Sequence, residues 1–152
     1  MAETKPAYLK PIPVPSHESK AYWEGLRQHK LMMPCCTACG HRWWPASHLC
    51  PACRAGPIAW EAVSGRGRVF TFVNFHRNYH KGFADERPYC VAVIALDEGP
   101  RMISNVIGIA VAEIACDMPV EVVFEDITDD ATLPKFRPAE TPGSPASTTL
   151  RR

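Results

Sequence analysis

Long apolar runs are missing from this 152-residue chain. No stretch approaches the roughly 18 apolar residues that a membrane-spanning helix needs. The first fifteen residues are polar and contain four prolines, which is not the pattern of a secretory signal. A strong net charge is absent too, because 17 basic and 16 acidic residues leave only +1. We therefore expect a cytoplasmic protein without membrane contact, and whole-chain charge gives no reason to expect a nucleic-acid binder.

Motifs for independent catalysis are also scarce. The Gly65-Arg66-Gly67 sequence is too short for a phosphate-binding loop and is more typical of a turn that enters a strand. Cys116 has no base nearby in the sequence, and Cys90 lies in an apolar run typical of a core thiol, so neither is predicted to be a nucleophile. One acid–base alternative is a loop-rich stretch that contains His76, His80, Asp85 and Glu86.

The charges that are present are segregated along the chain. Residues 1–90 hold twelve Lys and Arg against six Asp and Glu, together with all six histidines. Residues 97–130 hold one Arg against nine acidic residues. This asymmetry suggests one basic and one acidic face, although an ordinary solvated surface is an equal alternative. A basic face would attract phosphate groups.

Prolines and turn residues divide the chain into four parts. We expect an N-terminal arm and helix over residues 1–30, with the helix at 17–29 behind an N-cap at Ser16. A cysteine-rich module follows at 31–56, then a strand-rich domain at 57–138, and a Pro/Ser/Thr-rich disordered tail at 139–152. The expected strands are residues 58–63, 67–75, 89–96, 101–107 and 119–125, and five short strands suit a small barrel or sandwich.

The strongest motif is a pair of Cys-x2-Cys sequences ten residues apart, Cys36 with Cys39 and Cys50 with Cys53. Four thiolates at this spacing can converge tetrahedrally on Zn²⁺, and a closed four-thiolate site is structural rather than catalytic. Gly40 supplies the permissive backbone that such a turn often needs. A module of about 25 residues also needs a metal, since it cannot bury a sufficient core. Iron in a rubredoxin-like site remains a chemical alternative to zinc.

Cys35 offers an alternative first ligand, because it could pair with Cys39 across three residues in place of Cys36. The Cys-x2-Cys knuckle is tighter and commoner, so we assign Cys36 as the ligand. His41 and His48 lie in the same module but are not needed to complete four ligands.

The order of these motifs carries a family resemblance. The cysteine module LMMPCCTACGHRWWPASHLCPAC is followed by GRGRVFTFVNFH, RPYCVAVIALDEGPRMISNVIG, MPVEVVFE and LPKFRP. Over residues 13–138 this arrangement resembles the family catalogued as domain of unknown function thirty-five. The resemblance implies a mainly β fold, with an N-terminal helical segment and a rubredoxin-like zinc ribbon before a five-stranded OB-fold barrel. The chain departs from the family pattern at Cys35, where members usually carry a basic residue.

The resemblance also implies a function. Members commonly partner thiolase-like enzymes that act on acyl-CoA, and the small subunit completes or shapes the CoA-binding cleft while the partner carries the nucleophile. We therefore expect a hetero-oligomer with a thiolase-like subunit, CoA or acyl-CoA at the shared interface, and no catalytic residue in this chain. The alternative from the residues alone is a single-stranded nucleic-acid-binding OB-fold. Basic and aromatic residues suited to a CoA- or partner-facing surface are Trp43, Trp44, Arg66, Arg68, Arg77, Tyr79, Lys81 and Phe83.

Overall fold

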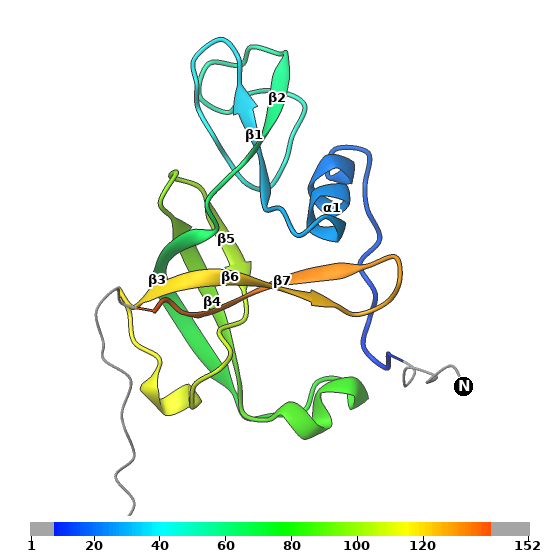
Figure 1. Cartoon of the computed structure of the whole chain (residues 1–152), viewed down its shortest axis with the longest axis vertical. Coiled ribbons are helices and arrows are strands. Elements are labelled where there is room, and N and C mark those ends of the chain that lie inside the picture. Colours follow the sequence, from blue (N-terminus) through cyan, green and yellow to red (C-terminus); the bar gives the residue numbers. More distant parts are fainter. Residues whose placement is uncertain (1–7, 141–152) are drawn as a thin grey trace, which may run out of the picture.

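The computed structural model describes residues 8–140 and shows two β sheets and one α-helix (Figure 1). A two-stranded sheet, β1–β2, stands above a five-stranded sheet with the order β5-β4-β3-β6-β7. The expectation of a mainly β chain with a cysteine-rich ribbon ahead of an OB-like sheet is confirmed. The elements are α1 (Lys20–Arg27), β1 (Met32–Cys36), β2 (Ile58–Ala62), β3 (Arg66–Phe75), the 3₁₀ helix η1 (Lys81–Glu86), β4 (Tyr89–Leu96), β5 (Arg101–Ser104), the 3₁₀ helix η2 (Val111–Glu113), β6 (Pro119–Asp126) and β7 (Thr132–Pro138).

Helix α1 is shorter than the sequence indicates. Its N-cap is Ser19, whereas Ser16 lies one turn earlier and bonds to Ser19. Glycine at position 25 permits close contact with β1, because a Cβ there would lie 2.3 Å from Cγ of Met32. Leu26 of the same helix is fully buried in the core, and its burial offsets the free-energy cost of a glycine inside a helix.

Strand β2 belongs to the ribbon and not to the barrel. It pairs antiparallel with β1, with Met33 opposite Glu61 and Cys36 opposite Ile58. The expectation that residues 58–63 form a barrel strand is therefore wrong. The fifth strand of the OB-like sheet is β7, which pairs with β6 along its whole length and which the sequence did not predict.

The core lies between the five-stranded sheet and the lower end of the ribbon. Its fully buried side chains include Val69, Ile94 and Phe136 from the sheet and Leu31 from the segment before β1. The continuous apolar run of β4 predicts a buried strand, whereas the structure shows an alternation of buried and half-buried positions. One face of β4 fills the core and the other faces outward.

The N-terminal arm lies across η1. Lys10 forms an ion pair with Glu86, and its ammonium group lies 4.9 Å from the centre of the Phe83 ring. Of the expected tail at 139–152, residues 141–152 lie outside the described residues. Between residues 8 and 140, no helix is long and apolar enough to span a membrane.

Candidate metal centre and outward sheet face

Two similar turns present the four cysteines of the ribbon. In the first, the Gly40 amide donates to the Cys36 carbonyl oxygen at 2.8 Å, and in the second the Arg54 amide donates to the Cys50 carbonyl oxygen at 2.9 Å. Both turns place the residue after their second cysteine in the left-handed region, with φ of 73° at Gly40 and 60° at Arg54. The repeated geometry aims both pairs of thiols at one point.

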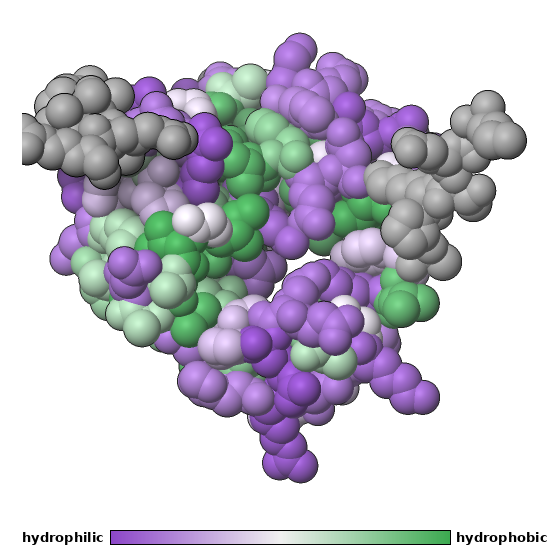
Figure 2. Space-filling view, turned by 60° about the horizontal axis from the view of Figure 1, so that its bottom comes forward, coloured by the Kyte–Doolittle hydropathy of each residue, from purple (hydrophilic) through white to green (hydrophobic). Residues whose placement is uncertain are grey.

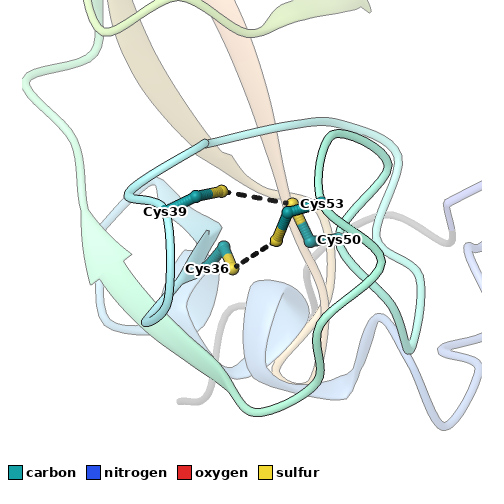
Figure 3. A group of neighbouring side chains, drawn as sticks. All are labelled: Cys36, Cys39, Cys50 and Cys53. Atoms are coloured by element: carbon teal, nitrogen blue, oxygen red, sulfur yellow. Dashed lines mark hydrogen bonds between the residues drawn. The ribbon is translucent and has the colours of Figure 1, made fainter.

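The four thiols converge as the Cys-x2-Cys spacing predicts (Figure 3). All four Sγ atoms lie within 4.8 Å of one another, with 3.6 Å between Cys36 and Cys53 and 3.7 Å between Cys39 and Cys50. A tetrahedral Zn²⁺ with bonds of about 2.3 Å places its sulfur atoms about 3.8 Å apart. The donor set and its spacing therefore fit a structural zinc ion. Cys35 lies outside this cluster, and its Sγ is directed to the Gly40 carbonyl oxygen at 3.7 Å.

The electrostatics of the cluster explain why it needs a cation. Hydrogen bonds from the backbone amide of Cys39, and to a smaller extent from Ala38 and neighbouring thiols, lower the pKa of Cys36 to about 7. The pKa of Cys39 rises to about 12, because hydrogen bonds with the other thiols and burial outweigh the amide of His41. The raised pKa of Cys39 disfavours its thiolate near neutral pH, and a bound dication would favour the thiolate.

Trp43 and Trp44 of the ribbon lie inward. Trp43 is only 7% exposed, packs against Cys36 and Cys50, and donates from Nε1 to the Ser47 hydroxyl at 3.1 Å. Trp44 is half-buried against the ring of Tyr22, with 4.1 Å between ring centres. These rings stabilise the ribbon and its contact with α1, so we leave them out of the candidate partner-facing surface.

The predicted basic residues lie on β3 and on the loop that follows it. Arg66 and Arg68 are exposed on β3, and Arg77 and Lys81 are exposed between β3 and β4. Tyr79 is also exposed, with its ring edge against Phe75. Phe83 differs, because its ring stacks on Tyr89 beneath the N-terminal arm and lines a cavity of about 140 Å³.

Sequence reasoning missed the outward face of strands β3, β4 and β5. Cross-strand pairs put Val73 beside Val91 and Val93 beside Ile103, all pointing away from the core. Phe70 lies at a register shift in β3, and the guanidinium carbon of Arg101 lies 3.7 Å from its ring centre. Figure 2 shows apolar residues exposed in several places on the side of the molecule that it draws, between hydrophilic ones. The residue types of β5 gave no signal for this face, because its exposed positions are Arg101 and Ile103 while the polar Ser104 is buried.

Two of the four residues of the acid–base alternative, His80 and Glu86, already have structural partners. Nδ1 of His80 accepts the Gly82 amide at 3.1 Å and caps η1, while Glu86 is paired with Lys10. Cys90 is buried in the core as expected, and its burial raises its pKa. Both His80 and Glu86 hold the loop and arm together.

Family models match both parts of the chain. The model described as "ChsH2, rubredoxin-like zinc ribbon domain" matches residues 23–59, and "ChsH2, C-terminal OB-fold domain" matches residues 60–125. A chain of the solved structure described as "Ltp2-ChsH2(DUF35) aldolase" is 32% identical, with a TM-score of 0.77. The similarity covers 83% of the present chain and 98% of that chain.

Curated relatives include subunits and scaffold proteins. A "probable enoyl-CoA hydratase alpha subunit" from Thermomonospora curvata is 35% identical over 90% of this chain, which spans only 42% of that relative. A "DUF35 domain-containing scaffold protein" from Methanocaldococcus jannaschii is 33% identical over 62% of this chain and 67% of that protein. These matches confirm the resemblance drawn from the cysteine spacing and the strand motifs. The chain belongs to the ChsH2-type family of zinc-ribbon and OB-fold proteins, also called DUF35 proteins.

Proposed function

We propose that this chain is a non-catalytic subunit of a thiolase-superfamily acyl-CoA enzyme, and that it completes or shapes the CoA-binding cleft of its partner. The observation that carries the proposal is the similarity to the DUF35 chain of the Ltp2-ChsH2(DUF35) aldolase, which extends over 98% of that chain. The name of that protein describes an assembly of two components. A chain that reproduces one component almost completely is best explained as the corresponding subunit of a similar assembly.

The chemistry of the described residues supports an auxiliary role. Four thiolates would fill the coordination sphere of the ribbon metal and leave no position for substrate. Two polar residues of the β3–β4 loop, His80 and Glu86, are engaged in holding the loop and the N-terminal arm. The nucleophile and the base are therefore assigned to the partner.

We infer that the cluster holds zinc and that the ion is structural. Zinc prefers tetrahedral thiolate ligands, and its binding supplies folding free energy to modules too small to fold without it. The ribbon core apart from the cysteines consists of little more than Trp43 with Ala55 and Ile58. Its stability therefore depends on the ion.

The loop between β3 and β4 is the best candidate for contact with CoA. Arg77 and Lys81 are exposed there and have no carboxylate partner among residues 8–140. Phosphate groups bind such cations, and the exposed ring of Tyr79 can cover an adenine face. We assign this loop to the CoA side of the shared cleft.

Calorimetric titration of CoA tests the proposal. CoA is titrated into this chain, into the Ltp2-type subunit of the same host, and into the two together. We expect the tightest binding with both chains present and little or none with this chain alone, because half of the cleft is then missing. The variant Arg77→Ala with Lys81→Ala should weaken binding to the complex, whereas Lys20→Ala, which removes an exposed lysine of α1, should not. Tight CoA binding by the isolated chain would contradict a shared cleft.

A second candidate function is single-stranded nucleic-acid binding. The observation in its favour is an exposed aromatic ring, Phe70, among arginines on the face of an OB-like sheet. The centre of that face is aliphatic, with Val73 and Ile103, and offers few rings for base stacking. Binding of a fluorescent oligonucleotide that weakens steeply with salt would favour this function over the first.

A further inference from the structure

We propose that the outward face of β3–β4–β5 is the surface that docks onto the thiolase-like subunit, and that this subunit presents an apolar patch rimmed by carboxylates. We call this surface the arginine-rimmed face. The inference rests on the proposed function and adds where and by what chemistry the two subunits meet. The face consists of Arg68, Phe70, Thr71, Val73, Val91, Val93, Ala95, Arg101 and Ile103.

The centre of the face is apolar and uncovered. Ile103 is 70% exposed, Val73 is 51% exposed and Phe70 is 48% exposed, although all three lie on regular or nearly regular strands. Within residues 8–140, the main contacts of α1 are with β1 and β7, which are not strands of this face. A contiguous apolar area of this kind on a rigid sheet is typical of a protein interface.

The rim is positively charged without internal compensation. Arg68 and Arg101 lie in one cross-strand row, each opposite Ala95 of the strand between them. Neither forms an ion pair with a described carboxylate, whereas Arg27, Arg42 and Arg137 elsewhere in the chain each do. The Arg68 guanidinium donates to the backbone carbonyl of Asp117, and Arg101 lies over Phe70, so both charges are oriented but not neutralised.

These features favour an acidic protein partner over a second copy of this chain. A symmetric dimer through this face would oppose arginine to arginine around its two-fold axis, which is electrostatically unfavourable. A carboxylate-bearing partner would instead pair with both arginines while the aliphatic centre is buried. The neighbouring loop with Arg77 and Tyr79 continues from the C-terminal end of β3, so docking here brings that loop to the partner.

Separate variants test the apolar centre and the arginine rim of the proposed docking face. Affinity for the Ltp2-type subunit of the same host is measured with Ile103→Asp, and with Arg68→Glu combined with Arg101→Glu. Matched controls on other surfaces are Val14→Asp, at a position that is 90% exposed, and Lys30→Glu, at an exposed lysine without an ion pair. Thermal unfolding of each variant reports on the fold, and sedimentation reports on self-association.

We expect Ile103→Asp and the double arginine variant each to raise the dissociation constant at least tenfold. The controls should stay within twofold of the unsubstituted chain, and the double variant should lose most of the salt dependence of binding. If the unsubstituted chain binds and every variant binds equally well, the docking face is wrong while the proposed function stands. If the unsubstituted chain does not bind this subunit, the proposed function and the docking face are both overturned. If it forms a dimer that Ile103→Asp dissolves while binding to the subunit persists, only the docking face is overturned.

Discussion

Arg54 has the same backbone conformation, at the same place in its turn, as Gly40. Each residue follows the second cysteine of a knuckle, each has a positive φ, and each donates its amide to the carbonyl of the first cysteine. A side chain in the left-handed region costs about 1 kcal/mol, and glycine avoids this cost. The ribbon therefore carries backbone strain in its second knuckle that is absent from its first.

This difference predicts opposite effects of two substitutions. Arg54→Gly should raise the free energy of unfolding by about 0.5–1 kcal/mol, and Gly40→Ala should lower it by a similar amount, after the opposing change in unfolded-chain entropy is included. Urea unfolding of the zinc-loaded protein measures both. Gly56→Ala is the matched control, because its added Cβ meets only ordinary contacts at 3.7 Å and it lacks a positive φ. A stabilising Gly40→Ala would show that the turn relaxes to another conformation.

The contact between Gly25 and Met32 predicts a coupled pair. Alanine at position 25 favours the helix by about 1 kcal/mol but forces its Cβ into Cγ of Met32, a clash that costs about 1–3 kcal/mol. We expect Gly25→Ala to destabilise the protein by about 1 kcal/mol on balance, and Met32→Ala to remove much of that penalty. A double-mutant cycle measured by denaturant unfolding gives the coupling energy. Additive effects would mean that α1 shifts freely on β1.

Glu98 predicts a pH dependence of stability. Burial raises the pKa of Glu98, but hydrogen bonds that include the Ser64 amide at 2.6 Å outweigh burial and leave the pKa below its usual value. A depressed carboxyl pKa adds stability above the unfolded pKa of about 4.5, and this stability is lost as pH falls through the folded value. Glu98→Gln should therefore lose about 1 kcal/mol at pH 7 and less below pH 4. Equal losses at both pH values would contradict this assignment.

Metal removal tests the four-cysteine cluster. Cys39→Ala and Cys50→Ala should each release the ion and unfold the ribbon, because three thiolates no longer enclose it. Cys35→Ala should retain one Zn²⁺ per chain, since Cys35 lies outside the cluster. Elemental analysis gives metal identity and stoichiometry, and chelator-induced unfolding gives the structural contribution. Full zinc content in Cys39→Ala and Cys50→Ala would disprove the ligand set.

The cysteine cluster was predictable from sequence because a Cys-x2-Cys knuckle fixes its own local geometry. The positions of β2 and β7 were not predictable in the same way. The largely apolar residues 58–62 are equally compatible with pairing to the ribbon or to the barrel, and only the register with β1 decides between them. Strand β7 contains Pro134 and Pro138, which argue against a strand but are tolerated here because β7 lies at an edge of the sheet.

The apolar run of β4 shows why the outward face was missed. Residues 89–96 are apolar throughout, which is typical of a strand buried on both sides. In this chain only one side is buried, as the alternation from Cys90 to Leu96 shows. The outward side chains of β4 are apolar like those of a strand that is buried on both sides. We propose that the partner docked on the arginine-rimmed face buries them.

Acyl-CoA turnover in a reconstituted system tests the central claim most directly. The Ltp2-type subunit of the same host is held at fixed concentration while this chain is added, and kcat/KM for its acyl-CoA substrate is followed. The account predicts that kcat/KM rises and saturates as this chain is added, and that the chain alone shows no turnover. Equal activity of the Ltp2-type subunit with and without this chain, or turnover by the chain alone, would contradict it.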